Sequence, residues 1–205
     1  MKIEGVARAG DRADKFAVMF DDGEEIKVSA AQIADFGLYS GREMSQDEYE
    51  ELRGDLALSS SKARALRILG SRNLSAFDLE KRLVSKGEDA DTAKKTVRWL
   101  EEIGAVNDAE YASMIARHYC GKGYGTARIK DELFRRGIAR DMWDDALSAI
   151  DGAEDASRGF LEKKLRGSRD KDELRRAADA LCRRGFSYSE ADAAVKRYVE
   201  ELEDD

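Results

Sequence analysis

Apolar residues recur along this chain in a pattern that repeats about every 50 residues. The clearest copy places Leu79, Leu83 and Val84 before Gly87, the spacing of one helix face that ends at a glycine. The equivalent positions are Ile129, Leu133, Phe134 and Gly137 in a second copy, and Ala177, Leu181, Cys182 and Gly185 in a third. A repeat of this length spans about three helices and predicts stacked helical modules.

The start of the chain shows the alternation of strands instead. Apolar and other side chains alternate over residues 16–20 and again over 26–28, on either side of the turn sequence Asp21-Asp22-Gly23. This arrangement predicts a β-hairpin. Ile3 and Val6 are too few apolar positions to predict a third strand.

Two helices are expected between the hairpin and the repeats. Ser29–Gln32 has the spacing of a capping box and opens a short helix that ends at Gly37. Ser45–Glu48 is a second capping box, whose helix extends to about Leu52. The stretch Gly54–Ser61, with three consecutive serines at its end, is the expected hinge or linker.

The patterns together predict a mainly α protein with three tandem three-helix repeats behind a small strand-containing N-terminal domain. The expected units are a small acidic α+β domain over 1–55 and helical repeats over 62–104, 105–152 and 153–205. Within the repeats, residues suited to capping a helix N-terminus stand where helices should begin. These residues are Ser75, Asn107, Asp170 and Ser187.

Composition and charge agree with a helical array. Charged residues make up 39% of the 205 residues and proline is absent, which favours long solvated helices. The net charge of −7 comes from the front of the chain, because residues 1–61 carry 7 Lys/Arg and 14 Asp/Glu, whereas residues 62–205 carry 29 of each. No signal peptide or membrane-spanning run is evident, so we expect a cytoplasmic protein with Cys120 and Cys182 reduced.

Three stretches resemble the RecX family of recombination regulators. They are Ala65-Leu66…Leu69…Arg72…Ser75…Leu79…Leu83…Lys86-Gly87, then Asn107-Asp108-Ala109-Glu110-Tyr111-Ala112, then the stretch from Gly125 to Ile138. The resemblance covers about residues 62–200 and implies an elongated, curved array of three repeats. It also implies a non-enzymatic protein of recombination, DNA repair and the SOS response. Such a protein binds the RecA filament and modulates, mainly by inhibition, its assembly, ATP hydrolysis and strand exchange.

A basic residue or pair stands directly before each repeat glycine, and more cations stand on neighbouring helices. The candidate partner-binding residues are Arg64, Arg67, Arg72, Lys81, Arg82, Lys86, Arg128, Lys130, Arg135, Arg136, Arg183 and Arg184. They could form a surface that faces an acidic groove or DNA phosphates. They could equally only complement helix macrodipoles, at about 0.3–1 kcal/mol each. On the first interpretation, charge reversal at Arg135 and Arg136 weakens filament binding and leaves thermal stability nearly unchanged.

Aromatic residues raise an alternative function. Tyr111, Tyr119 and Tyr124 have cations nearby in the sequence and could stack on single-stranded bases, although tyrosines at helical spacing more often belong to a core. The alternative is thus a helical-repeat protein that binds single- or double-stranded DNA directly through its basic clusters. Trp143 is expected in the core, and Trp99 packs against the next repeat or faces a partner.

Residue patterns for catalysis and metal binding are missing. Gly121–Gly125 lacks the spacing of a phosphate-binding loop and follows a helix, so an interhelical turn is expected. His118 and Cys120 do not share a helix face, and the chain holds one histidine and two cysteines in all. We therefore expect no enzyme activity, catalytic residue, metal or cofactor, and a monomer whose partner is the RecA filament, with weak DNA contact at most.

Overall fold

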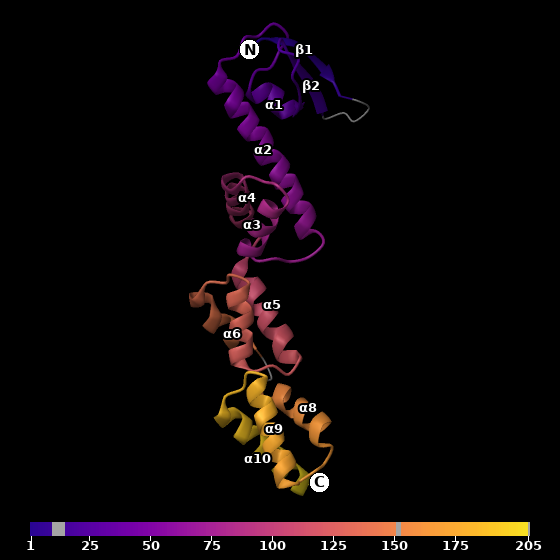
Figure 1. Ribbon diagram of the computed structural model, residues 1–205, viewed down its shortest axis with the longest axis vertical. Helices are drawn as coiled ribbons and strands as arrows, with labels where there is room; N and C mark the ends of the chain where they lie inside the picture. The colour runs from indigo at the N-terminus through magenta and orange to yellow at the C-terminus, as the bar shows by residue number, and fades with distance from the viewer. Residues whose placement is uncertain (10–14, 151–152, 205) are drawn as a thin grey trace.

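The computed structural model describes residues 1–9, 15–150 and 153–204. The molecule is elongated, with the N-terminal domain at one end and the C-terminal helices at the other (Figure 1). Successive units follow one another along the long axis, and each has a hydrophobic core of its own. The expected mainly α architecture, with three three-helix repeats behind a small strand-containing domain, is confirmed.

The N-terminal domain is a three-stranded antiparallel sheet covered by helices. Strands β1 (Ile3–Arg8), β2 (Lys15–Phe20) and β3 (Glu25–Ser29) lie in that order. The predicted hairpin is the β2–β3 pair, and β1 is a third strand that the sequence pattern did not predict. The short helix α1 (Ala30–Asp35) begins at a capping box on Ser29, as expected.

A single helix, α2 (Gln46–Leu69), joins this domain to the first repeat. The prediction of a linker over Gly54–Ser61 is therefore wrong. Ser61 is fully buried, and its Oγ accepts a hydrogen bond of 2.9 Å from the Thr96 hydroxyl. At the other end of the segment, the Gln32 side chain of α1 donates to Asp55 at 2.6 Å. Contacts on both sides thus hold a serine-rich stretch in helical form, against its weak intrinsic preference.

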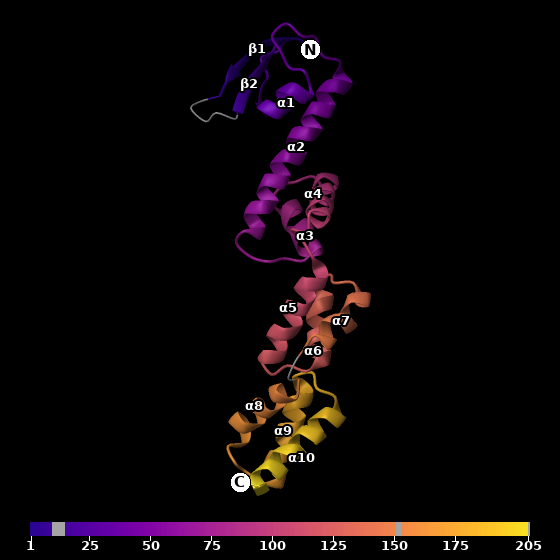
Figure 2. The same cartoon turned by 180° about the vertical axis from the view of Figure 1, so that it is seen from behind.

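Each repeat is a bundle of three helices around a separate core. The first contains the C-terminal half of α2 with α3 (Ala76–Ser85) and α4 (Ala90–Glu102). The second contains α5 (Asp108–Gly121), α6 (Thr126–Arg135) and α7 (Trp143–Ser148), the last preceded by a 3₁₀ turn over Arg140–Met142. The third contains α8 (Ala153–Leu165), α9 (Lys171–Arg183) and α10 (Tyr188–Asp204). Seen from behind, α10 lies in front of α9 (Figure 2).

The recurring apolar positions of the second helices divide between core and surface. The core positions are Leu79 and Leu83, Ile129 and Leu133, and Ala177 and Leu181, all at most 2% exposed. The next residue differs between the copies: Val84 is 43% exposed and Phe134 is 65% exposed, whereas Cys182 is half-buried and packs against the third core. Five residues advance an α-helix about 140° beyond a full turn, so the sixth position of the pattern lies at the edge of the buried face or outside it.

The two tryptophans occupy the edges of cores. Trp143 is half-buried against the second core, rather than fully inside it, and its indole N–H donates to the Ile138 carbonyl at 3.0 Å. Trp99 packs against the core of its own repeat, with the Lys62 ammonium 4.5 Å above its ring. Across the described part of the chain, no helix is both long enough and apolar enough to cross a membrane.

The continuity of α2 gives a stability prediction. Gly54 lies within the helix at an exposed position, with nothing within 4 Å of an added Cβ. A glycine inside a helix costs roughly 0.5–1 kcal/mol relative to alanine. Gly54→Ala should therefore raise the free energy of unfolding by about that much in urea titrations followed by circular dichroism. A loss of stability would indicate that this segment must bend.

Candidate partner-binding surface

The second helices of the three repeats meet end to end. At the first junction, the Ser75 hydroxyl at the start of α3 donates to the Arg136 carbonyl at the end of α6, at 2.6 Å. At the second junction, the amides of Gly125 and Ala127 at the start of α6 donate to the carbonyls of Arg184 and Gly185, both at 3.0 Å. The helices α9, α6 and α3 therefore form one head-to-tail line along the molecule (Figure 1).

The contacts at both junctions give hydrogen-bond partners to backbone groups at the helix ends. The first amides and the last carbonyls of a helix have no partners inside it. Here the carbonyl end of one helix accepts from the amino end of the next, which also aligns opposite ends of their macrodipoles. Asp108 adds to the first junction, because its carboxylate accepts from the Ala76 amide at 2.8 Å. Burial raises the pKa of Asp108, although that hydrogen bond acts in the opposite direction.

The recurring glycines have two roles that the sequence pattern did not separate. Gly87, Gly137 and Gly185 all have a positive φ, which stops the helix as expected. At Gly137 a Cβ would overlap the Phe77 ring, and at Gly185 it would lie 2.5 Å from the Arg128 amide nitrogen. At Gly87 an added Cβ would have nothing within 4 Å, because none of the helices in the described ranges is stacked beyond the end of α3.

Four half-buried cations among the twelve predicted ones make contacts that position the helices. Arg64 donates to the Lys86 carbonyl at 2.9 Å, which provides the carbonyl end of α3 with the partner that a stacked helix supplies elsewhere. Arg184 crosses the second junction to the Gly123 carbonyl at 2.7 Å and lies over the Tyr124 ring at 4.4 Å. Arg136 donates to the Tyr111 hydroxyl at 2.7 Å, and Arg128 is paired with Glu132 at 3.2 Å.

The expectation that reversal at Arg136 spares stability is therefore corrected. Arg136 is only partly exposed, lies over the Tyr111 ring and is bonded to its hydroxyl, so a carboxylate in its place would lose both contacts. Burial raises the pKa of Tyr111, opposed by the Arg136 guanidinium, so the phenol stays protonated and accepts that bond. Its neighbour Arg135 is exposed and makes its contact with Glu132 at 3.3 Å.

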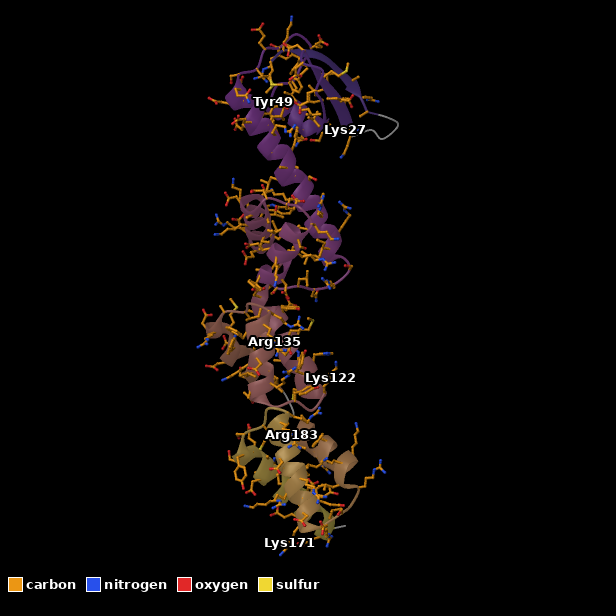
Figure 3. The ribbon with its side chains drawn as sticks, in the orientation of Figure 1. Lys27, Tyr49, Lys122, Arg135, Lys171 and Arg183 are labelled. Carbon is orange, nitrogen blue, oxygen red and sulfur yellow. The ribbon has the colours of Figure 1, made fainter. Side chains whose placement is uncertain are left out.

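The remaining predicted cations are open to solvent to different degrees. Arg82 and Lys130 are half-buried. The exposed members are Arg67, Arg72, Lys81, Lys86, Arg135 and Arg183. Arg135 and Arg183 lie at equivalent places, at the carbonyl ends of α6 and α9, and Figure 3 shows them one above the other along the array. Sequence alone could not tell Arg183 from Arg184, although one is exposed and the other crosses a junction.

The three tyrosines considered for base stacking mainly pack against other parts of the protein. Tyr111 belongs to the second core, Tyr119 packs against it, and Tyr124 lies beneath Arg184. The turn Gly121–Gly125 is an interhelical turn, as predicted, and a Cβ on Gly125 would overlap the Gly185 backbone. Among the described residues, no group of three or more His, Cys, Asp or Glu side chains is placed to hold a metal ion.

Fold and surface together define a helical-repeat protein with exposed cations at equivalent positions of its second and third repeats. A sequence profile described as "RecX, second three-helix domain" matches residues 107–147, which are the second repeat. "Regulatory protein RecX" of Xanthomonas axonopodis pv. citri (strain 306) is 31% identical over 141 residues, covering 67% of this chain and 87% of that protein. This chain belongs to the RecX family of regulatory proteins.

Other relatives extend the similarity over nearly the whole chain. "Regulatory protein RecX" of Clostridioides difficile (strain 630) is 26% identical over 211 residues, covering 98% of this chain and 94% of that protein. A crystal structure of regulatory protein RecX has the same fold, with a TM-score of 0.77 at 18% identity over 93% of this chain and 97% of that one. RecX from Lactobacillus salivarius has a TM-score of 0.63 at 21% identity, over 69% and 96% of the two chains.

The two roles of the glycines can be separated by mutation. Gly87→Ala should cost about 1–2 kcal/mol of stability, because only its positive φ is strained. Gly185→Ala should cost about 1–3 kcal/mol more, because its Cβ also presses on the backbone of the stacked helix. Urea unfolding of both variants measures the difference. An equal loss of unfolding free energy in both variants would mean that the backbone at the second junction can shift without cost, and that this contact does not stabilise the stacking of the repeats.

Proposed function

We propose that this chain binds the filament that RecA recombinase forms on DNA and restrains filament assembly, ATP hydrolysis and strand exchange. The elongated array lies along the filament and bridges neighbouring protomers. It occupies surface that the next protomer or the partner DNA needs. Inhibition on this proposal is stoichiometric competition between surfaces, and no chemical step is involved.

The observation that carries the proposal is the regular placement of exposed cations on stacked helices. Arg135 and Arg183 stand at the same point of successive repeats, and Lys86 stands one residue later in the first repeat. A filament repeats its own surface along its length, so a linear array with one cation per unit is suited to several protomers at once. The regulatory names of the relatives support the same function.

Direct DNA binding has weaker support. The tyrosines that could stack on bases are core or half-buried residues, as described above. The net charge of −7 also opposes tight binding of a polyanion. If bare DNA were the main partner, its affinity would fall steeply with salt, in proportion to the number of phosphates contacted.

The proposal predicts a defined effect of charge reversal at the exposed positions. Arg135→Glu combined with Arg183→Glu should raise the protein concentration needed for half-inhibition about tenfold, since each reversal replaces attraction by repulsion at a rim position. The measurement is ATP hydrolysis by preformed RecA filaments on single-stranded DNA, with the protein titrated in. Both side chains are exposed, so the thermal midpoint should stay nearly unchanged.

A matched control carries the same change in charge elsewhere on the molecule. Lys27→Glu with Lys171→Glu alters two exposed residues, one on β3 and one at the start of α9, away from the carbonyl ends of α6 and α9 (Figure 3). This control should inhibit like the unaltered protein. If both double variants lose inhibition equally, total charge rather than this surface governs binding. If the unaltered protein has no effect at a concentration equal to that of RecA, the proposed function is wrong.

A further inference from the structure

Three large apolar side chains on the stacked helices are exposed. Phe77 is 50% exposed, Val84 is 43% exposed and Phe134 is 65% exposed. Val84 and Phe134 occupy the same position of two successive repeats, one residue after a fully buried leucine in each. Two repeats thus place an apolar side chain outside their hydrophobic core. Large apolar side chains exposed in this way indicate a binding surface rather than a contribution to folding.

Phe77 and Phe134 stand on the two sides of the first junction, and Lys81 and Val84 continue the outer face of α3. Phe77, Lys81 and Val84 are four and three residues apart and therefore share a face of α3. The Phe77 ring lies against Gly137, whose amide donates to the Phe134 carbonyl at 3.0 Å. Phe77 at the start of α3 and Phe134 near the end of α6 thus stand next to the same turn, which follows α6 at Gly137. We call Phe77, Lys81, Val84, Phe134 and Arg135 the α3–α6 patch.

Several cations lie around this patch. The Lys81 ammonium lies 6.0 Å from the centre of the Phe77 ring. Arg135 shares the single, largely buried carboxylate of Glu132 with Arg128 and Arg136, at 3.3, 3.2 and 4.0 Å. One carboxylate cannot neutralise three guanidinium groups, so an excess positive charge remains beside Phe134. The carboxylates of Asp131 on α6, and of Asp78 and Asp108 at the start of α3, offset part of it.

We propose that the α3–α6 patch binds an acidic segment of a protein partner, in which carboxylates flank a large apolar side chain. The apolar side chain packs between Phe77 and Phe134, and the carboxylates pair with Arg135 and Lys81. The inference rests on the proposed function, because it takes a protein of the recombinase filament as the partner. It adds that an apolar contact, and not charge alone, anchors the regulator.

The patch suits a protein segment better than a nucleic acid. Val84 is aliphatic and cannot stack on a base as an aromatic ring does, yet it holds the position that Phe134 holds in the next repeat. An apolar surface rimmed by cations is complementary to apolar and acidic side chains together.

The test is Phe134→Ser, compared with Tyr188→Ser. Tyr188 is 77% exposed at the start of α10, outside the patch, so the control removes an aromatic ring of similar exposure. Preformed RecA filaments on single-stranded DNA are the probe, with binding measured by co-sedimentation and inhibition by ATP hydrolysis. Phe134→Ser should weaken both by about tenfold or more, and at high salt as well as low, whereas Tyr188→Ser should stay within about twofold of the unaltered protein.

The outcomes separate this inference from the proposed function. Binding of the unaltered protein together with unchanged binding of Phe134→Ser overturns the inference and leaves the proposed function in place. An equal loss of affinity for bare single-stranded DNA also overturns it, because the ring would then stack on bases. Failure of the unaltered protein to bind filaments overturns both proposals. Thermal midpoints within about 2 °C of the unaltered protein show that the variants are folded, since both side chains are exposed.

Discussion

The last carbonyls of a helix need hydrogen-bond partners, and at both junctions of this chain the start of the next stacked helix supplies donors to them. The carbonyl end of α9 meets the start of α6, and the carbonyl end of α6 meets the start of α3. Separate cores on either side of each junction would otherwise be free to turn independently. The two glycines that let the helix ends approach so closely therefore fix the order, the spacing and the direction of the repeats.

A consequence of this stacking is that each repeat has the same side turned outward. The inner face of each second helix packs on its own core, and the two junctions cover both ends of α6, the start of α3 and the end of α9. The exposed residues of these helices include Arg135 and Arg183 at equivalent points, and Val84 and Phe134 at another pair of equivalent points. The proposed function and the proposed apolar contact both depend on surface residues that recur along the molecule, because the three-helix unit that carries them recurs.

The helices and the cores were predictable from sequence because they depend on local spacing. The pair Leu79 and Leu83 and its two counterparts mark the buried faces, and the Ser75 and Ser45 caps mark helix starts. The continuity of α2 was not predictable, because the partners of Ser61 and Asp55 lie more than 20 residues away. Val84 and Phe134 were placed on the wrong face because an apolar residue next to a core position looks like part of the core.

The candidate site was only half predictable for a related reason. A run of cations before a glycine gives the residue type but not the direction of each side chain. Arg183 and Arg184 are adjacent and alike in sequence, yet one is exposed and the other reaches a carbonyl 61 residues away. Contacts across the junctions join residues from different repeats, and no local pattern shows them. The junctions, and the patch beside the first one, needed the three-dimensional arrangement.

Hydroxyl-radical footprinting shows directly whether the filament covers the α3–α6 patch, because the oxidation of an aromatic side chain reports the solvent exposure of that side chain. The protein would be oxidised alone and when bound to RecA filaments on single-stranded DNA. Phe77 and Phe134 should become protected, while Tyr188 and Tyr39, which are also exposed but lie far from the first junction, should react as before. Unchanged oxidation of Phe134 together with protection of Tyr39 or Tyr188 would contradict the account, and would place the partner on another surface.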